Sequence, residues 1–170
     1  MEKGPCQLGY LCLALLLAGL GCQPPSDGVE AANKEVVQAV YDAIDAQDYD
    51  RLTELTADDF VGHVAGVPEP FDRDAVFEMI RTWYGAFPDY VHVVETMVAE
   101  GDRVAVRLTY NGTHQGEVEG IPATGNRISY AGAHMVTVVD GQIQEMWVLE
   151  DMLGLMMQLG MQLVPAEQES

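Results

Sequence analysis

The sequence predicts an α+β domain in which N-terminal helices pack on a mainly antiparallel sheet. Two patterns predict it. Apolar residues recur at helical spacing in the first half of the chain, and long segments rich in Val, Thr and Tyr fill most of the second half. An Asp-Gly pair at 140–141 separates two of those segments, which is a strong hairpin signal.

Three helices are expected before the strands. Asn33 can cap the first, whose apolar face contains Val36, Val37, Val40, Tyr41 and Ile44. A second short helix is expected over Tyr49–Leu55, and residues 56–70 are expected to be irregular. Asp72 can cap the third, and Pro88 ends it; its apolar stripe contains Val76, Phe77, Ile80, Trp83, Tyr84 and Phe87.

Four strands and a final helix are expected in the second half of the chain. The strands cover residues 91–99, 103–115, 127–139 and 142–150, with turns at 101–102 and 140–141. Residues 152–163 are rich in Met and Leu, and we expect them to pack as a short helix against the mouth of the domain.

The first residues predict an export signal. Residues 1–21 contain a short apolar run that ends in small residues before Cys22, and a Pro-rich segment follows. This order resembles a bacterial lipobox, although Gly19 stands where leucine is usual. We therefore expect a signal peptide over 1–21, lipidation at Cys22, a linker over 22–32, the domain over 33–163 and a polar tail over 164–170. The alternative is an uncleaved anchor helix. Either way the domain is expected in the cell envelope, outside the cytoplasm and anchored to a membrane.

The charge and the cysteines narrow the functional classes. A formal net charge of −19 repels nucleic acid, so we expect no nucleic-acid partner. Cys22 is the only cysteine outside the leader, which excludes a disulfide framework or a cysteine-based metal site in the domain. A zinc site made of His63, His114 and His134 is conceivable, but no tight ligand spacing supports it. We therefore expect no metal.

The hairpin predicts a candidate active site. If residues 140–141 form the turn, opposite positions pair His134 with Trp147 and Tyr130 with Asp151, all on one face of the sheet. Apolar surroundings raise the pKa of a carboxyl group towards neutral pH, which suits proton transfer. We therefore expect Asp151 and His134 to be catalytic, with Tyr130 and Trp147 lining a ligand site, provided that no bulge intervenes.

Each of these residues also has an ordinary structural interpretation. Asp151 can cap the helix that follows it, His134 can be a hydrogen-bonded core histidine, and both aromatic residues can belong to the core. Trp83 can likewise fill a collapsed pocket instead of lining an open one. The opposite face of the hairpin is mixed in character and suits either solvent or a dimer contact.

Three further residues are candidates for ligand binding. His114 is in phase with the inward residues of its strand, and Arg107 is in the opposite phase. His63 can reach the mouth of a pocket from its loop, although a solvated loop histidine is the ordinary interpretation.

Several segments resemble the SnoaL-like polyketide or ester cyclase family. They are Phe87-Pro88-Asp89, the stretch 112–116, the stretch 120–125, and the ending 145–155 followed by Gln158-Leu159-Gly160. The resemblance covers roughly residues 33–160. It implies a cone-shaped fold of the nuclear transport factor 2 type, with helices closing a curved sheet around a pocket. It also implies cyclisation without a cofactor, by an acid/base aspartate that matches Asp151.

Two functions follow from these expectations. One is an enzyme that moves a proton on a small hydrophobic carbonyl compound. The other is a tethered, non-catalytic module that binds such a compound in the same pocket, since this fold implies no single function. An exported domain is a departure from polyketide cyclisation, which is ordinarily cytoplasmic.

Overall fold

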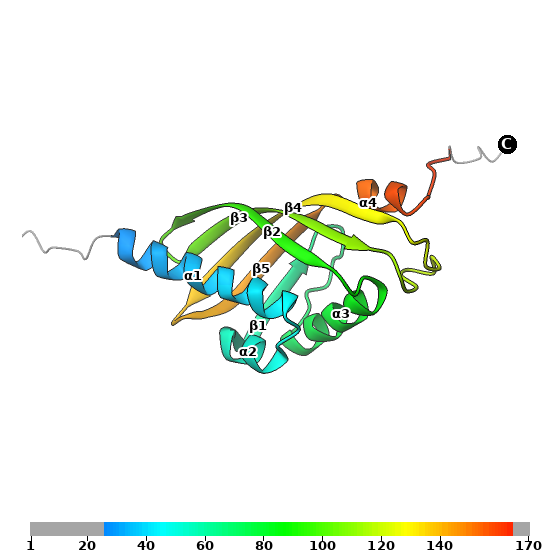
Figure 1. The fold of residues 1–170 in the computed structure, drawn as a ribbon. Helices are drawn as coiled ribbons and strands as arrows, with labels where there is room; N and C mark the ends of the chain where they lie inside the picture. Colours follow the sequence, from blue (N-terminus) through cyan, green and yellow to red (C-terminus); the bar gives the residue numbers. More distant parts are fainter. Residues whose placement is uncertain (1–25, 165–170) are drawn as a thin grey trace, which may run out of the picture.

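A computed structural model of the chain describes residues 26–164, and its five strands form one sheet (Figure 1). The order across the sheet is β1, β5, β4, β3, β2. Strands β2 to β5 pair antiparallel, whereas β1 runs parallel to β5. The strands are β1 Thr56–Val64, β2 Val91–Glu100, β3 Arg103–Thr113, β4 Arg127–Val139 and β5 Gln142–Glu150. The predicted mainly antiparallel sheet is confirmed.

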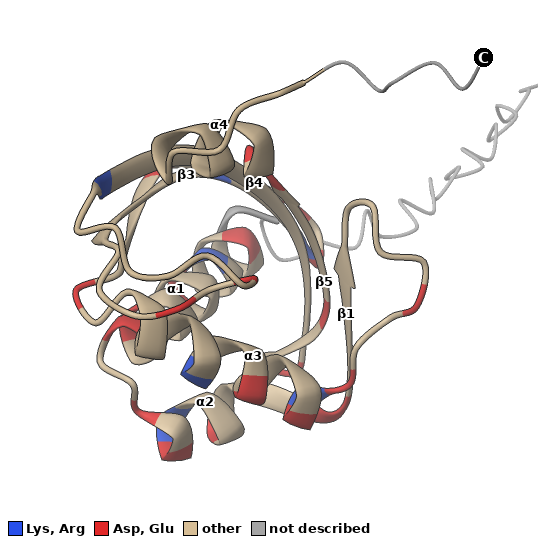
Figure 2. Cartoon of the chain, turned by 90° about the vertical axis from the view of Figure 1, so that its right-hand side faces the viewer, with Lys and Arg blue, Asp and Glu red and all other residues tan. Residues whose placement is uncertain are grey.

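Helices α1, α2 and α3 pack on one side of the curved sheet, which bends around them (Figure 2). Their bounds are α1 Ser26–Asp45, α2 Tyr49–Leu55 and α3 Arg73–Ala86, and the short helix α4, Met152–Gln158, follows β5. Among the described residues, 26–164, none of the helices has both the length and the apolar character needed to cross a membrane. The expected α+β arrangement of helices on a curved sheet is confirmed.

The core lies between these helices and the inner face of the sheet. Alternate residues of β3 and β4 point inwards, as period-2 strands require. The buried apolar residues of these two strands are Val104, Val106, Leu108, Tyr110, Ile128, Tyr130, Val136 and Val138. Val37, Val40 and Tyr41 of α1 and Phe77 and Tyr84 of α3 pack against them. The apolar stripes predicted for α1 and α3 therefore face the core.

The helix starts differ from expectation at α1 only. Asp72 caps α3 as predicted, and its carboxylate accepts a hydrogen bond from Ala75 N at 2.9 Å. Helix α1 begins at Ser26, within the segment expected to be linker, so Asn33 lies inside the helix instead of capping it. Its side chain donates to the carbonyl of Gly101 at 2.9 Å and ties α1 to the β2–β3 turn.

Strand β1 lies where an irregular segment was predicted. Only Phe60 and Gly62 alternate as buried residues in its second half, while Asp58 and Asp59 are exposed, so the local pattern is weak. Its partner β5 lies more than 80 residues away in the sequence. Because this pairing is parallel and long-range, no local turn signal announces it.

The hairpin turn forms as predicted, with Asp140 and Gly141 both at positive φ, 50° and 80°. Val139 pairs with Gln142 and Val138 with Ile143. The register then shifts by one residue, so that Thr137 pairs with Glu145 and Gln144 has no opposite partner. Strand β1 shifts register against β5 at the same place, and the Gln144 carboxamide donates to the Asp59 carboxylate there at 2.7 Å.

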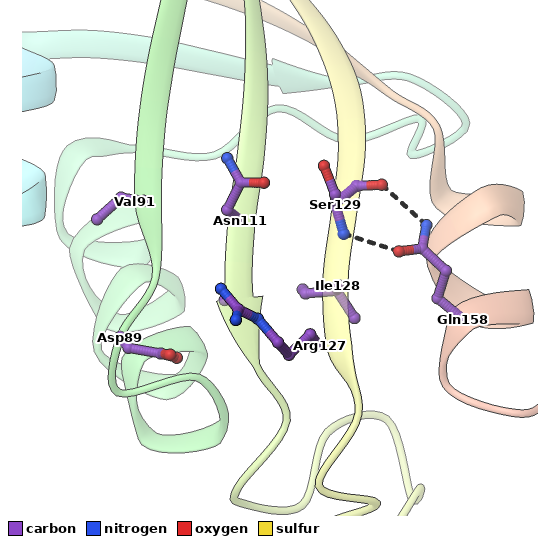
Figure 3. A pocket seen from close by; sticks show the side chains of 8 residues that line it. Asp89, Val91, Asn111, Arg127, Ile128, Ser129 and Gln158 are labelled. Atoms are coloured by element: carbon purple, nitrogen blue, oxygen red, sulfur yellow. Dashed lines mark hydrogen bonds between the residues drawn. The ribbon is translucent and has the colours of Figure 1, made fainter.

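Helix α4 continues beside β4 beyond the end of β5. The Gln158 side chain forms two hydrogen bonds with the backbone of Ser129, at 2.7 and 3.0 Å (Figure 3). The Gln158 carboxamide thereby makes the backbone hydrogen bonds that a longer β5 would otherwise make with this residue of β4. Leu155 and Leu159 of this segment are buried in the core. The final helix is thus confirmed, although it ends at Gln158 instead of Leu163.

Candidate functional site

The register shift in the β4–β5 hairpin separates the residues that were expected to converge. His134 pairs with Val148, and Met135 pairs with Trp147. Since neighbouring residues of a strand point to opposite faces, the shift places Trp147 on the outer face, where it is 53% exposed. Tyr130 and His134 remain on the inner face, both buried. The predicted convergence of all four residues is therefore wrong, and a bulge is the reason.

Asp151 lies outside the interior and caps a helix. It is exposed, and its carboxylate accepts a hydrogen bond from Gly154 N at 2.8 Å at the start of α4. The expected position of its side chain beside His134 is not observed. The inward position at the end of β5 belongs to Glu150, which pairs with Gly132.

A chain of buried hydrogen bonds crosses the interior from α1 to β3. The Tyr41 hydroxyl lies 2.7 Å from Nδ1 of His134, and the Tyr110 hydroxyl lies 2.6 Å from Nε2 of the same ring. Burial, and then the charge of His92, lowers the pKa of His134 to about 3. The imidazole is therefore neutral at physiological pH, with one donor and one acceptor nitrogen.

Gly132 makes this chain possible. A Cβ atom at this position would lie 2.5 Å from Cε2 of Tyr110, so the tyrosine ring occupies the space of the missing side chain. Burial raises the pKa of Glu150, which pairs with Gly132, and a hydrogen bond from Tyr110 partly opposes the shift. The Tyr110 hydroxyl thus contacts His134 and lies on the same face of the sheet as Glu150.

A second polar cluster lies beside the first. The Asp45 carboxylate accepts from the backbone N–H of His92, contacts His92 Nδ1 at 2.5 Å, and accepts from the Tyr84 hydroxyl at 3.1 Å. The hydroxyls of Tyr90 and Tyr130 hydrogen-bond each other. The interior of the cone is therefore aromatic and polar, with histidine, carboxyl and phenol groups in contact.

Two other predicted ligand residues do not belong to this chain: His114 is buried and Trp83 is half-buried. His114 is fully buried and stacks on Phe87, with its Nδ1 hydrogen-bonded by Thr124. Trp83 packs against Phe87 and Tyr90. The ring N–H of Trp83 and Nε2 of His114 are both buried without a partner among the described residues. The inward phase predicted for His114 is confirmed.

His63, Trp147 and Arg107 lie on the outer face of the sheet. His63 stacks on Trp147 with a centroid distance of 3.9 Å and contacts Glu145 at 3.2 Å. Arg107 forms an ion pair with Glu95. A hollow of about 440 Å³ opens on this face, and both Trp147 and Arg107 line it together with Met135 and Leu149, among other residues. These three predicted residues do not join the interior chain.

A second hollow, of about 340 Å³, lies beside α4 over neighbouring ends of β2, β3 and β4 (Figure 3). Its polar lining contains Asp89, Asn111, Arg127 and Ser129, and Gln158 closes one side. Hydrogen bonds from the backbone and hydroxyl of Thr113, together with the positive charge of Arg127, hold the pKa of Asp89 below its usual value. This hollow is separate from the interior chain.

The interior chain supports proton transfer because it places hydroxyl groups on an imidazole, with the titratable carboxyl of Glu150 on the same face of the sheet. Reasoning from the sequence found His134 and Tyr130 but missed Glu150, Tyr110 and Tyr41. One signal was present: a glycine inside a strand often marks the close approach of another group, and Gly132 receives the Tyr110 ring.

Comparison with known proteins identifies relatives of this chain. Residues 34–159 match the profile of the SnoaL-like polyketide cyclase family. Aklanonic acid methyl ester cyclase DnrD of Streptomyces peucetius is 38% identical over 86 residues, which cover 49% of this chain and 59% of DnrD. DauD of Streptomyces sp. strain C5, with the same activity in its name, is 37% identical over 86 residues, covering 49% of this chain and 53% of DauD. The matched segment therefore spans little more than half of these relatives.

Solved structures agree over a longer part of the chain. IdmH of Streptomyces antibioticus, assigned to the polyketide cyclases, superposes with a TM-score of 0.71 at 31% identity, covering 76% of this chain and 99% of IdmH. AclR of Streptomyces galilaeus, assigned instead as a hydroxylase, has a TM-score of 0.71 at 29% identity, covering 77% of this chain and 97% of AclR. Proteins of this shape are thus assigned to more than one chemistry.

The depressed pKa of His134 predicts a pH-dependent stability. Unfolding returns its pKa from about 3 to 6.5, so between these values the unfolded chain binds more protons and the free energy of unfolding falls as the pH falls. His134→Gln should remove up to about 1.4 kcal/mol per pH unit from this slope between pH 6 and 4. Urea unfolding at a series of pH values measures it.

Tyr41→Phe is the matched control for this experiment. It removes one hydrogen bond to the same ring but keeps the titrating imidazole, so stability should drop by about 1 kcal/mol while the slope persists. A slope in His134→Gln equal to that of the native protein would contradict the assignment.

Proposed function

Because the chain belongs to the SnoaL-like polyketide cyclase family, we propose that it converts a small hydrophobic carbonyl compound by acid/base chemistry, without a cofactor. The observation that carries this proposal is the buried chain of Tyr41, His134 and Tyr110, with the Glu150 carboxyl on the same face of the sheet, opposite Gly132. Burying a polar group costs free energy unless the group is hydrogen-bonded. Here titratable groups of the core are hydrogen-bonded to one another.

The chemistry that suits this interior is the removal of an acidic proton next to a carbonyl group. A carboxylate takes the proton from carbon, the electron pair moves to the carbonyl oxygen, and a neutral hydroxyl donor stabilises the resulting enolate. The two relatives DnrD and DauD are named for cyclising a methyl ester. The carboxylate comes from the end of β5, where Glu150 and Asp151 follow one another; Asp151 is the one that the family resemblance nominates.

Proton exchange at carbon tests this function without knowledge of the natural substrate. In D₂O, the native protein should accelerate deuterium uptake at the α-carbon of a β-keto methyl ester carrying an alkyl chain, measured by proton NMR. His134→Gln should lower the protein-dependent rate by about 10²-fold, which is the usual contribution of a positioned proton-transfer system.

His63→Gln is the control, because His63 is a histidine of the outer face and should leave the rate unchanged. Exchange in native protein no faster than in buffer would contradict the enzymatic proposal.

A non-catalytic binding module is the second candidate. One observation favours it: the carboxylate of Asp151, the residue that the family resemblance nominates for catalysis, is engaged as a helix cap. Saturable binding of the same ester, followed by tryptophan fluorescence, with no deuterium uptake would support this candidate over the enzyme.

We also propose that the outer face of the sheet binds a second copy of the chain. Its exposed apolar side chains include Val98, Met135, Trp147 and Leu149, which are 65%, 54%, 53% and 60% exposed. Monomers rarely expose such a continuous apolar patch. A sheet of this size presents about 800 Å², which is the area each partner buries in a standard interface. A two-fold axis would pair this face with itself, so one patch serves both subunits.

Met135→Glu should therefore shift the protein from dimer to monomer in analytical ultracentrifugation, because a charge would be buried against the partner. Met79→Glu is the control: Met79 is exposed on α3, away from this face, and should leave the mass unchanged. A native protein that sediments as a monomer at micromolar concentration would contradict the dimer.

We propose, finally, that the domain is exported and anchored to the membrane by lipid on Cys22. Residues 1–25 lie outside the described residues, so this proposal rests on the sequence alone. Several acyl chains on one cysteine anchor a protein stably, whereas one chain does so only weakly.

Expression of the full chain in a bacterial host should therefore yield a membrane-fraction protein that lacks residues 1–21 and carries added lipid mass. Cys22→Ser should abolish both changes in the intact mass. An unmodified Cys22 in the membrane-extracted protein would contradict lipidation.

A further inference from the structure

We propose that Glu150, and not Asp151, is the carboxyl group that exchanges the proton in the interior, and that Tyr110 and His134 are positioning residues whose hydrogen bonds reverse with its charge. This inference rests on the proposed acid/base function and names the residue that performs it.

The register places Glu150 on the inner face. Gly132 pairs with Glu150, and Gly132 and His134 alternate as buried residues of β4. Side chains of paired residues lie on the same face of the sheet, so Glu150 points to the side on which His134 lies. Asp151, one residue further, starts the turn into α4, where its carboxylate is held by Gly154 N.

Packing brings the Tyr110 hydroxyl to His134 and over Gly132, the residue that pairs with Glu150. The ring crosses Gly132, and a Cβ at that position would lie 3.0 Å from the hydroxyl oxygen as well as 2.5 Å from Cε2. From there the hydroxyl reaches His134 Nε2 at 2.6 Å on the same strand. Glu150 is the cross-strand neighbour of Gly132 on the other side. The missing side chain at position 132 thus leaves the space in which the Tyr110 hydroxyl lies beside the imidazole and on the face of the carboxyl.

The donors and acceptors of this chain can be arranged in two ways, one for each protonation state of Glu150. When Glu150 is ionised, the Tyr110 hydroxyl donates to the carboxylate and accepts from Nε2–H of His134, whose Nδ1 accepts from Tyr41. When Glu150 is protonated, it donates to Tyr110, Tyr110 donates to Nε2, and Nδ1–H donates to Tyr41. One proton gained at Glu150 therefore changes the tautomer of His134 while every heavy atom stays in place.

This arrangement balances the proposed reaction. The C–H bond of the substrate breaks, the proton forms an O–H bond with the Glu150 carboxylate, and the electron pair becomes the enolate. The proton returns from Glu150 to the product. The histidine never becomes charged, which is consistent with its burial.

The surroundings of Glu150 keep it available for this role. Burial raises its pKa, while the hydrogen bond from Tyr110 and the charge of His92 on β2 oppose the shift. Tyr90 and Tyr130 are the other titratable groups that the carboxylate affects, and its charge raises the pKa of both. A carboxyl with a raised pKa accepts and returns a proton more readily near neutral pH than an exposed one does.

The first test compares two conservative variants in the deuterium-uptake assay with the β-keto methyl ester. Glu150→Gln should lower the protein-dependent rate by about 10²-fold or more, whereas Asp151→Asn should stay within about threefold of native. Native activity with an unaffected Glu150→Gln, or with an inactive but folded Asp151→Asn, would overturn the inference. Absence of activity in the native protein would instead contradict the proposed function.

The second test needs no activity. With ¹⁵N-labelled histidine, NMR identifies which ring nitrogen of His134 carries the proton across a pH titration. The native protein and Asp151→Asn should show the tautomer change as Glu150 titrates, whereas Glu150→Gln should show one tautomer throughout. The same tautomer at every pH in all three proteins would overturn the inference, whatever the outcome of the activity assay.

Discussion

In the β4–β5 hairpin, Gln144 lies between two residues of β5 that pair with neighbouring residues of β4, so it has no partner of its own. Strand β1 changes its register against β5 at the same place, and the Gln144 side chain reaches Asp59 there. The irregularity is therefore shared by three strands. Because a shift of one residue turns every following side chain to the other face, this bulge decides which residues of β5 belong to the interior.

The interior follows from that choice. With Glu150 facing inwards and Trp147 facing outwards, the carboxyl is surrounded by tyrosines and histidines, not by indole. Gly132 then has a structural role: the Tyr110 ring occupies the space that a side chain at position 132 would fill. From there the Tyr110 hydroxyl reaches His134. Helix α4 completes the arrangement, because Asp151 caps it and Gln158 extends the pairing of β4.

The same alternation gives the outer face its character. Trp147, Met135 and Leu149 are exposed on it, and His63 stacks on the indole. Exposed apolar side chains on the outer face and a few hydrogen-bonded polar groups within an apolar core both depart from the usual distribution of a small domain. Both departures are reasonable if each surface has a separate task, with chemistry or binding inside the cone and association with a second copy outside it.

The sequence by itself determined the fold class, two strands to the residue, the cap of α3 and the turn of the last hairpin, because those signals are local: period, capping side chains and an Asp-Gly pair. It also placed His114, His134 and Tyr130 on the inner face of the sheet, where all three are buried. Only the tertiary structure decided that residues 56–64 form a strand and that Glu150, not Asp151, faces the interior. The first depends on pairing between β1 and β5, which lie more than 80 positions apart, so that no local signal in residues 56–64 marks it. The second depends on the bulge at Gln144, where β5 changes its register against both β4 and β1, and a bulge leaves the pattern of apolar and polar residues in the strand unchanged.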